Sequence, residues 1–211
     1  MQKQRLSIGS AIDFGWEQTK KHFWFLALVV VITMVIGYLP GIVGDAFDED
    51  MLPMIVIVFL VIGAFFMWIA QMLVSVGLVR ISLSLVDGKK PKLGILFDNF
   101  GYFLNYLAAS ILYGLATLGG LLFFVVPGII FWVRFQFYSY AVVEEHASPI
   151  AALKRSWSMT RGVTWQVILL NFAMIGINLI GVLLLGVGLL WSIPVSFIGM
   201  AHVYRQLRKN G

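Results

Sequence analysis

Long apolar stretches alternate with short polar ones from about residue 23 to the C-terminal region. A bilayer core about 30 Å thick needs about 20 helical residues to cross it, and several of these stretches reach that length. The two longest are each long enough for two crossings. The pattern therefore predicts six spanning helices, at about residues 23–43, 52–79, 103–126, 128–146, 163–181 and 187–204.

The two longest stretches contain natural breaks. Pro127-Gly128 falls inside the first, and Gly186 and Gly188 lie near the middle of the second. Proline interrupts a helix and glycine accepts unusual backbone angles, so both places are expected to be turns. We predict one all-α integral membrane domain over residues 1–211, folded as a six-helix bundle.

Lysine and arginine occur on only one side of the predicted spans. Fourteen of the 15 lie in the N-terminal segment, the second and fourth connections and the C-terminal segment. The remaining one, Arg134, lies within a span, and acidic residues gather in the first connection. Because basic loops stay in the cytoplasm, both ends of the chain are expected there.

Each predicted pair of spans follows a short amphipathic segment, at residues 7–21, 92–101 and 149–160. Apolar residues recur at helical spacing in all three, and those of the first and third end on a tryptophan, Trp16 or Trp157. The segments are too short and too polar to span. We therefore expect helices that lie in the cytoplasmic interface with their tryptophans at headgroup level. Plain linkers are the alternative.

The first and third amphipathic segments also match each other without a gap. The aligned pairs are Ala11 with Ala152, Ile12 with Leu153, Gly15 with Ser156, Trp16 with Trp157, Thr19 with Thr160, Lys20 with Arg161, and Trp24 with Trp165. The middle segment is a weaker copy. We interpret the chain as three tandem units of one orientation, each an interfacial helix followed by a hairpin of spans. Chance similarity is the alternative, and the matched polar pairs argue against it.

The composition is that of a membrane protein without a visible active site. Hydrophobic residues make up 60% of the chain and charged residues 12%, whereas a soluble domain has about 25% charged residues. The absence of cysteine excludes disulfides and thiolate chemistry. The three histidines lie in separate segments, and no carboxylate lies deep in a span. We expect no catalytic residue, metal or cofactor, and we interpret Glu144-Glu145-His146 as a solvated helix end.

Arg134 is the one charge within a predicted span. An arginine there costs on the order of 3 kcal/mol on insertion scales, so it needs partners. Counting from the predicted turns places Asn171, Asn178, Ser192 and Ser196 of the fifth and sixth spans near its depth. We predict that these five residues form an intramembrane site. It either locks the bundle or receives an anionic headgroup or solute from the outer side; the alternative is that Arg134 snorkels outward to lipid phosphates.

The central part of the chain resembles a group of bacterial inner-membrane proteins. The group comprises the YciC-like proteins and the membrane domain attached to some glycerophosphodiester phosphodiesterases. The matching residues are Pro127-Gly128-Ile129, Arg134, Ala152-Leu153-Lys154-Arg155-Ser156-Trp157, Thr160-Arg161-Gly162 and, before the first span, Phe14-Gly15-Trp16. The resemblance implies a six-helix bundle in a bacterial cytoplasmic membrane. It carries over no catalytic residue, because the phosphodiesterase domain is not among these 211 residues.

Two functions of different classes follow from these patterns. The first is a non-enzymatic membrane module whose partners are membrane lipids, anionic at the inner face, or another protein; nucleic acid is not expected. The second is a small-solute or lipid transporter or channel, which parallel repeats permit. A membrane enzyme ranks last. A polar cavity at mid-membrane depth would favour transport, and a filled apolar centre would favour the module.

Overall fold

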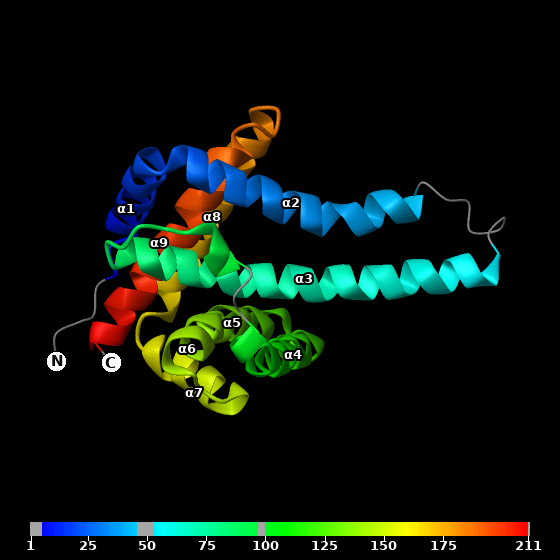
Figure 1. The fold of residues 1–211 in the computed structure, drawn as a ribbon. Coiled ribbons are helices and arrows are strands. Elements are labelled where there is room, and N and C mark those ends of the chain that lie inside the picture. Colours follow the sequence, from blue (N-terminus) through cyan, green and yellow to red (C-terminus); the bar gives the residue numbers. More distant parts are fainter. Residues whose placement is uncertain (1–5, 46–52, 97–99, 211) are drawn as a thin grey trace.

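The computed structural model describes residues 6–45, 53–96 and 100–210, and these residues form helices and no strand, which confirms the all-α class. In chain order the helices are α1 (Ile8–Lys21), α2 (Phe23–Asp45), α3 (Met54–Val86), η2 (Leu93–Leu96, a 3-10 helix), α4 (Phe100–Phe123), α5 (Val125–Phe135), α6 (Tyr138–Glu145), α7 (Pro149–Met159), α8 (Thr164–Leu183) and α9 (Leu189–Asn210) (Figure 1).

Four helical stretches are long and apolar enough to cross a membrane. They are Met54–Val86, Gly101–Phe123, Val125–Glu145, which combines α5 and α6, and Thr164–Leu183. Helices α1 and α2 meet at a bend of 98°, and this bent pair raises the number to five. Helix α9, in the place of the sixth predicted span, is not apolar enough to join them. The total of six therefore stays a prediction.

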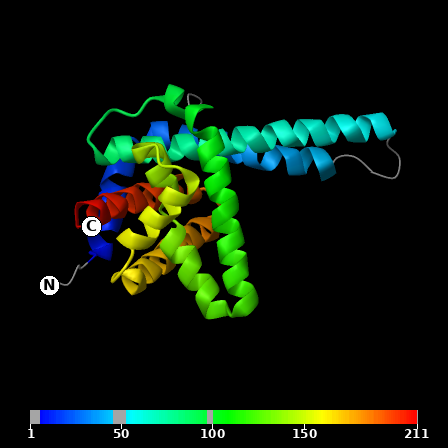
Figure 2. The ribbon, with the colours of Figure 1, turned by 90° about the horizontal axis from the view of Figure 1, so that it is seen from below.

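Consecutive long helices pair as hairpins: α2 with α3, α4 with α5, and α8 with α9. The α2–α3 hairpin extends well beyond the other helices, and the α4–α5 hairpin points in another direction (Figures 1 and 2). The hairpins thus point in different directions, and the six-helix bundle stays a prediction. Their far ends expose apolar side chains such as Phe59, Phe66 and Leu122. Lipid tails are as apolar as these side chains, so the hydrophobic effect does not drive them together.

The α2–α3 hairpin packs on α9, and α6, which follows the α4–α5 hairpin, also reaches α9. Its Ala201, Tyr204 and Leu207 are buried, and the Tyr204 ring stacks on Tyr140 of α6 with ring centres 4.9 Å apart. Helix α9 contacts α1, α2, α3, α7 and α8. A helix enclosed by protein does not need the uniformly apolar surface of a helix that faces lipid, which explains its lower hydropathy.

The turn between α4 and α5 is displaced from its predicted place. It lies at Phe124, and Pro127-Gly128 belongs to the first turn of α5. Proline fits there because the first N–H groups of a helix have no helical partner. Gly128 faces α4, where a β-carbon on it would come within 2.9 Å of the Leu121 backbone nitrogen. The glycine therefore permits the close approach of the two helices rather than the turn itself.

Two other boundaries also differ from the prediction. Helix α3 continues to Val86, past the predicted end of its span at residue 79. The middle amphipathic segment, residues 92–101, contains η2, which packs on α3. Residues 97–99 of this segment lie outside the described residues.

Candidate functional site

Arg134 lies in the last turn of α5, directly against α7. Its guanidinium carbon is 3.4 Å from the centre of the Trp157 ring, and its Nη2 donates a hydrogen bond to the Trp157 carbonyl oxygen at 3.0 Å. That carbonyl belongs to the last turn of α7, where helical carbonyls lack helical partners and a cation is favourable by about 0.3–1 kcal/mol. A cation over an indole face adds about 0.5–2 kcal/mol. Both contacts join α5 to α7.

The backbone beside Arg134 is also held by α7. The helix breaks between α5 and α6, and such a break frees carbonyl and N–H groups that are costly to leave without partners in an apolar setting. Ser156 Oγ donates to the Arg134 carbonyl oxygen at 2.7 Å and accepts from the Phe137 N–H at 3.1 Å. Thr160 Oγ1 donates to the same carbonyl at 3.3 Å. We call these five residues (Arg134, Phe137, Ser156, Trp157 and Thr160) the α5–α7 joint.

The other members of the predicted intramembrane site lie elsewhere. Asn178 Nδ2 donates to Ser196 Oγ at 2.8 Å, and Ser196 Oγ donates to the Ser192 carbonyl at 2.9 Å, which joins α8 to α9. Asn171 Nδ2 donates to the Val167 carbonyl within α8. None of these hydrogen bonds in the described residues involves Arg134, so they do not support the predicted grouping, which stays a prediction. Counting residues along a predicted span gives the depth of a residue in the membrane, but not the direction in which its side chain points.

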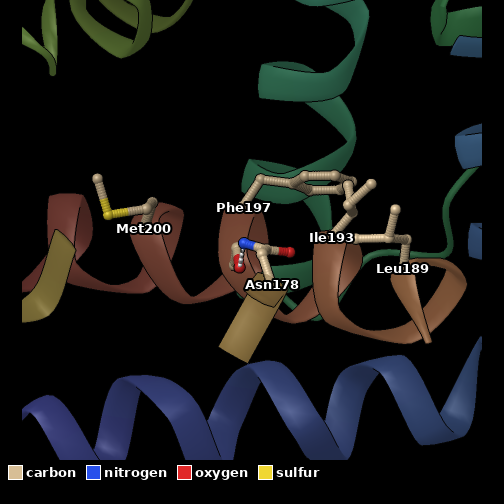
Figure 3. Close-up of a pocket in the computed structure, with 6 residues that line it drawn as sticks. Asn178, Leu189, Ile193, Phe197 and Met200 are labelled. Atoms are coloured by element: carbon tan, nitrogen blue, oxygen red, sulfur yellow. Dashed lines mark hydrogen bonds between the residues drawn. The ribbon is translucent and has the colours of Figure 1, made fainter. Parts of the chain in front are cut away.

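The Asn178–Ser196 pair lies in an open groove of about 410 Å³, lined also by Leu189, Ile193, Phe197 and Met200. Figure 3 shows the Asn178 amide among these apolar side chains, with a dashed line at its hydrogen bond. Within the described chain, the Asn178 side-chain oxygen is buried without a hydrogen-bond partner. This α8–α9 groove is neutral, since its lining carries no charged residue.

A second open groove, of about 480 Å³, lies between α4, α5 and α7. Its apolar lining consists of Leu112, Ala116, Phe135, Ile150, Leu153 and Trp157. Lys154 adds the one charge of this lining. We call it the α4–α7 groove. It adjoins the α5–α7 joint, because Trp157 belongs to both.

Comparison with known sequences places the chain in a family. The profile of a domain of unknown function, DUF7847, matches residues 51–206. The chain belongs to this family. The match runs from α3 into α9 and so includes the α5–α7 joint and both grooves of the DUF7847 chain.

The DUF7847 chain is also similar to uncharacterized proteins of Mycobacterium bovis and of two strains of Mycobacterium tuberculosis. Each is 26% identical over 230 residues, which cover 98% of this chain and 70% of the relative. The names of these relatives state no activity. No solved structure matches the chain.

The DUF7847 chain also contains a network of charges where α3, α6 and α9 end. Arg205 of α9 bonds Asp87 at the end of α3, at 2.7 Å, and Glu144 at the end of α6. Arg208 also pairs with Glu144 and with Glu145, and Arg155 of α7 pairs with Glu145. Carboxylates are unfavourable at helix C-termini, so the arginines offset that cost.

This charge network corrects the sequence interpretation of the acidic pair. Glu144 is not a solvated helix end, because its side chain is only 17% exposed and contacts two arginines. Burial lowers the pKa of Arg205, but its hydrogen bonds to Glu144 and Asp87 outweigh burial and raise that pKa above its ordinary value. The sequence places these groups in three separate segments, so their meeting was not visible in it. Among the described residues, no cluster of three or more His, Asp or Glu side chains could hold a metal ion.

The two matched segments of the DUF7847 chain form helices with equivalent contacts. Ala11, Gly15 and Thr19 of α1 are buried, as are the aligned Ala152, Ser156 and Thr160 of α7. A β-carbon on Gly15 would lie 2.5 Å from the Val195 carbonyl oxygen of α9, just as Ser156 meets the Arg134 carbonyl of α5. Trp16 packs on Trp191 of α9, and Trp157 packs on Phe131 of α5.

Proposed function

We propose that the protein is a non-enzymatic module of a bacterial cytoplasmic membrane that contacts lipids along its outward surfaces. The observation that carries this proposal is the way the hairpins meet. Their junction around α9 is filled by Phe137, Tyr140 and Tyr204, whereas the described grooves open outward. A filled centre leaves no passage for a solute, and open apolar grooves suit acyl chains. No catalytic group, cofactor or nucleic acid is part of this proposal.

The proposed topology has six spans and both ends in the cytoplasm. Three tandem units would place α1, the segment with η2, and α7 at the cytoplasmic face. The contacts are compatible with this arrangement, because each of these segments packs on a hairpin: α1 on α9, η2 on α3, and α7 on α4, α5 and α6. The near-perpendicular bend between α1 and α2 is the geometry of an interfacial helix that turns into a span. The kinship with YciC-like proteins stays a prediction.

A small-solute or lipid transporter is the second candidate function. The α8–α9 groove favours it, because the buried Asn178 side-chain oxygen has a free acceptor site there. Buried acceptors without partners are uncommon in proteins, and a ligand donor would satisfy this one. The groove's openness and its location outside the filled junction favour the module over a solute pathway.

Purified protein in vesicles separates the two functions. We expect no flux of small ions, sugars or amino acids above that of protein-free vesicles. We also expect lipid to remain with the protein through detergent exchange, measured by mass spectrometry. Flux that depends on Asn178 would contradict the module and support transport.

A further inference from the structure

The cations on and beside α7 divide into two groups. Arg155 pairs with Glu145, within the charge network that also uses Asp87 and Glu144. No ion pair found in the described chain reaches Arg134, Lys154 or Arg161. Consecutive residues on a helix point in different directions, so Lys154 faces the α4–α7 groove while Arg155 faces α6.

The three cations without a carboxylate partner gather around Trp157. The Arg134 guanidinium lies over the Trp157 ring, Lys154 lies one helical turn before Trp157, and Arg161 follows in the turn after α7. No ion pair found in the described chain supplies a counter-charge to any of the three. Like charges that approach without a counter-charge are destabilising, and a bound anion would reverse that cost.

The space beside these cations is apolar. Leu112, Ala116 and Leu153 line the α4–α7 groove, whose volume of about 480 Å³ is in the range of ligand sites. Phe135 packs against Trp157 with ring centres 5.1 Å apart, and both side chains line the groove. An apolar groove lined by a tryptophan and a lysine, with Arg134 over that tryptophan and Arg161 following α7, matches a lipid with an anionic headgroup.

We propose that the α4–α7 groove binds one anionic glycerophospholipid. This inference rests on the proposed function and names its ligand. An acyl chain lies along Leu112, Ala116 and Leu153, and Lys154 and Arg161 bind the headgroup phosphate. A soluble anion would leave the apolar groove uncovered, and a zwitterionic lipid would leave the cations without a net counter-charge. Under the proposed topology, the lipid comes from the cytoplasmic leaflet.

The test is a lipid titration of the full-length protein in detergent, followed by native mass spectrometry. Phosphatidylglycerol should bind at one tight site, and phosphatidylcholine of the same chain length should bind much more weakly. Lys154→Gln with Arg161→Gln should weaken phosphatidylglycerol binding about 30-fold, the effect of two basic residues near a lipid surface. The matched control, Lys89→Gln with Lys92→Gln, removes the same charge from exposed loop positions and should change binding less than threefold.

The groove itself is tested by Ala116→Phe, which fills it without changing any charge. This variant should also weaken phosphatidylglycerol binding, and glycerol 3-phosphate, which lacks acyl chains, should not compete. Equal losses in the site and control pairs would overturn the proposal, as would effective competition by glycerol 3-phosphate. Solute flux into vesicles that contain the unaltered protein would instead refute the proposed function. The lipid titration would still decide whether the α4–α7 groove binds an anionic lipid. Both altered cations are exposed, so the variants are expected to fold.

Discussion

Arg134 and Trp157 make two contacts at once: the guanidinium lies over the indole ring, and it donates to the carbonyl of the same residue. The two residues are 23 positions apart, on α5 and α7. Of the two roles predicted for Arg134, this geometry supports the lock, because its partners are protein groups. The lock does not exclude a lipid, since the neighbouring Lys154 and Arg161 remain accessible.

The first prediction concerns this lock. Arg134→Leu should destabilise the folded protein by about 2–3 kcal/mol, because it removes a charged hydrogen bond and a cation–π contact. A double-mutant cycle with Trp157→Leu, followed by thermal unfolding in detergent, should give a coupling of at least about 1 kcal/mol. Additive effects of the two substitutions would show that the cation–π contact contributes no stability, since the hydrogen bond to the backbone carbonyl of residue 157 is kept in Trp157→Leu.

The second prediction concerns the break between α5 and α6. Ser156→Ala should cost about 1–3 kcal/mol, since it leaves the Arg134 carbonyl without its short hydrogen bond and the Phe137 N–H without its acceptor. Ser158→Ala is the matched control. Its hydroxyl is exposed and bonds only its own helix, so the unfolding midpoint should hardly move. Similar midpoints for both variants would mean that the break does not depend on Ser156.

The third prediction concerns the packing of α1 on α9. Gly15→Ala should destabilise by about 1–3 kcal/mol, because its β-carbon would lie 2.5 Å from the Val195 carbonyl oxygen and the helices would have to separate. Gly9→Ala on the same helix meets no atom within 4 Å. It should be neutral or stabilise by up to about 1 kcal/mol through helix propensity. The order of the two midpoints in thermal unfolding is the measurement, and the reverse order would contradict the close contact between α1 and α9.

The fourth prediction concerns the charge network. Glu144→Gln removes the carboxylate that pairs with Arg205 and Arg208, and it should cost about 1–3 kcal/mol because the site is only partly solvated. Glu17→Gln changes the net charge equally at an exposed position of α1 and should have little effect. Denaturation of both variants at low and high salt provides the comparison. If Glu144→Gln is as stable as Glu17→Gln, the network does not hold the helix ends together.

The fifth prediction concerns topology. The chain contains no cysteine, so single cysteines can be introduced without a background. Asp48→Cys should react with an impermeant thiol reagent applied to intact cells, and Lys90→Cys should react only after the membrane is opened. The physical reason is the one-sided distribution of lysine and arginine. Labelling in the opposite order would invert the proposed orientation.

The sequence by itself determined the helical class, the approximate place of the helices and the aligned buried positions of α1 and α7. These features depend on local periodicity, which needs no knowledge of the fold. Helix α7, for example, begins at Pro149, because proline suits the first position of a helix. The aligned small residues are buried in both α1 and α7, because a match in sequence implies that each helix packs with the same face.

Only the tertiary structure decided which side chains meet. Arg134 turned out to contact Trp157 rather than Asn178, and Glu144 turned out to be paired rather than solvated. Apolar stretches show that a helix forms and roughly where it ends. They do not show how far it is rotated about its axis or which neighbour it packs on. The rotation of a helix and its choice of neighbour depend on close contacts such as that between Gly128 and Leu121. Rotation and neighbour together decide which partner each polar group finds in apolar surroundings.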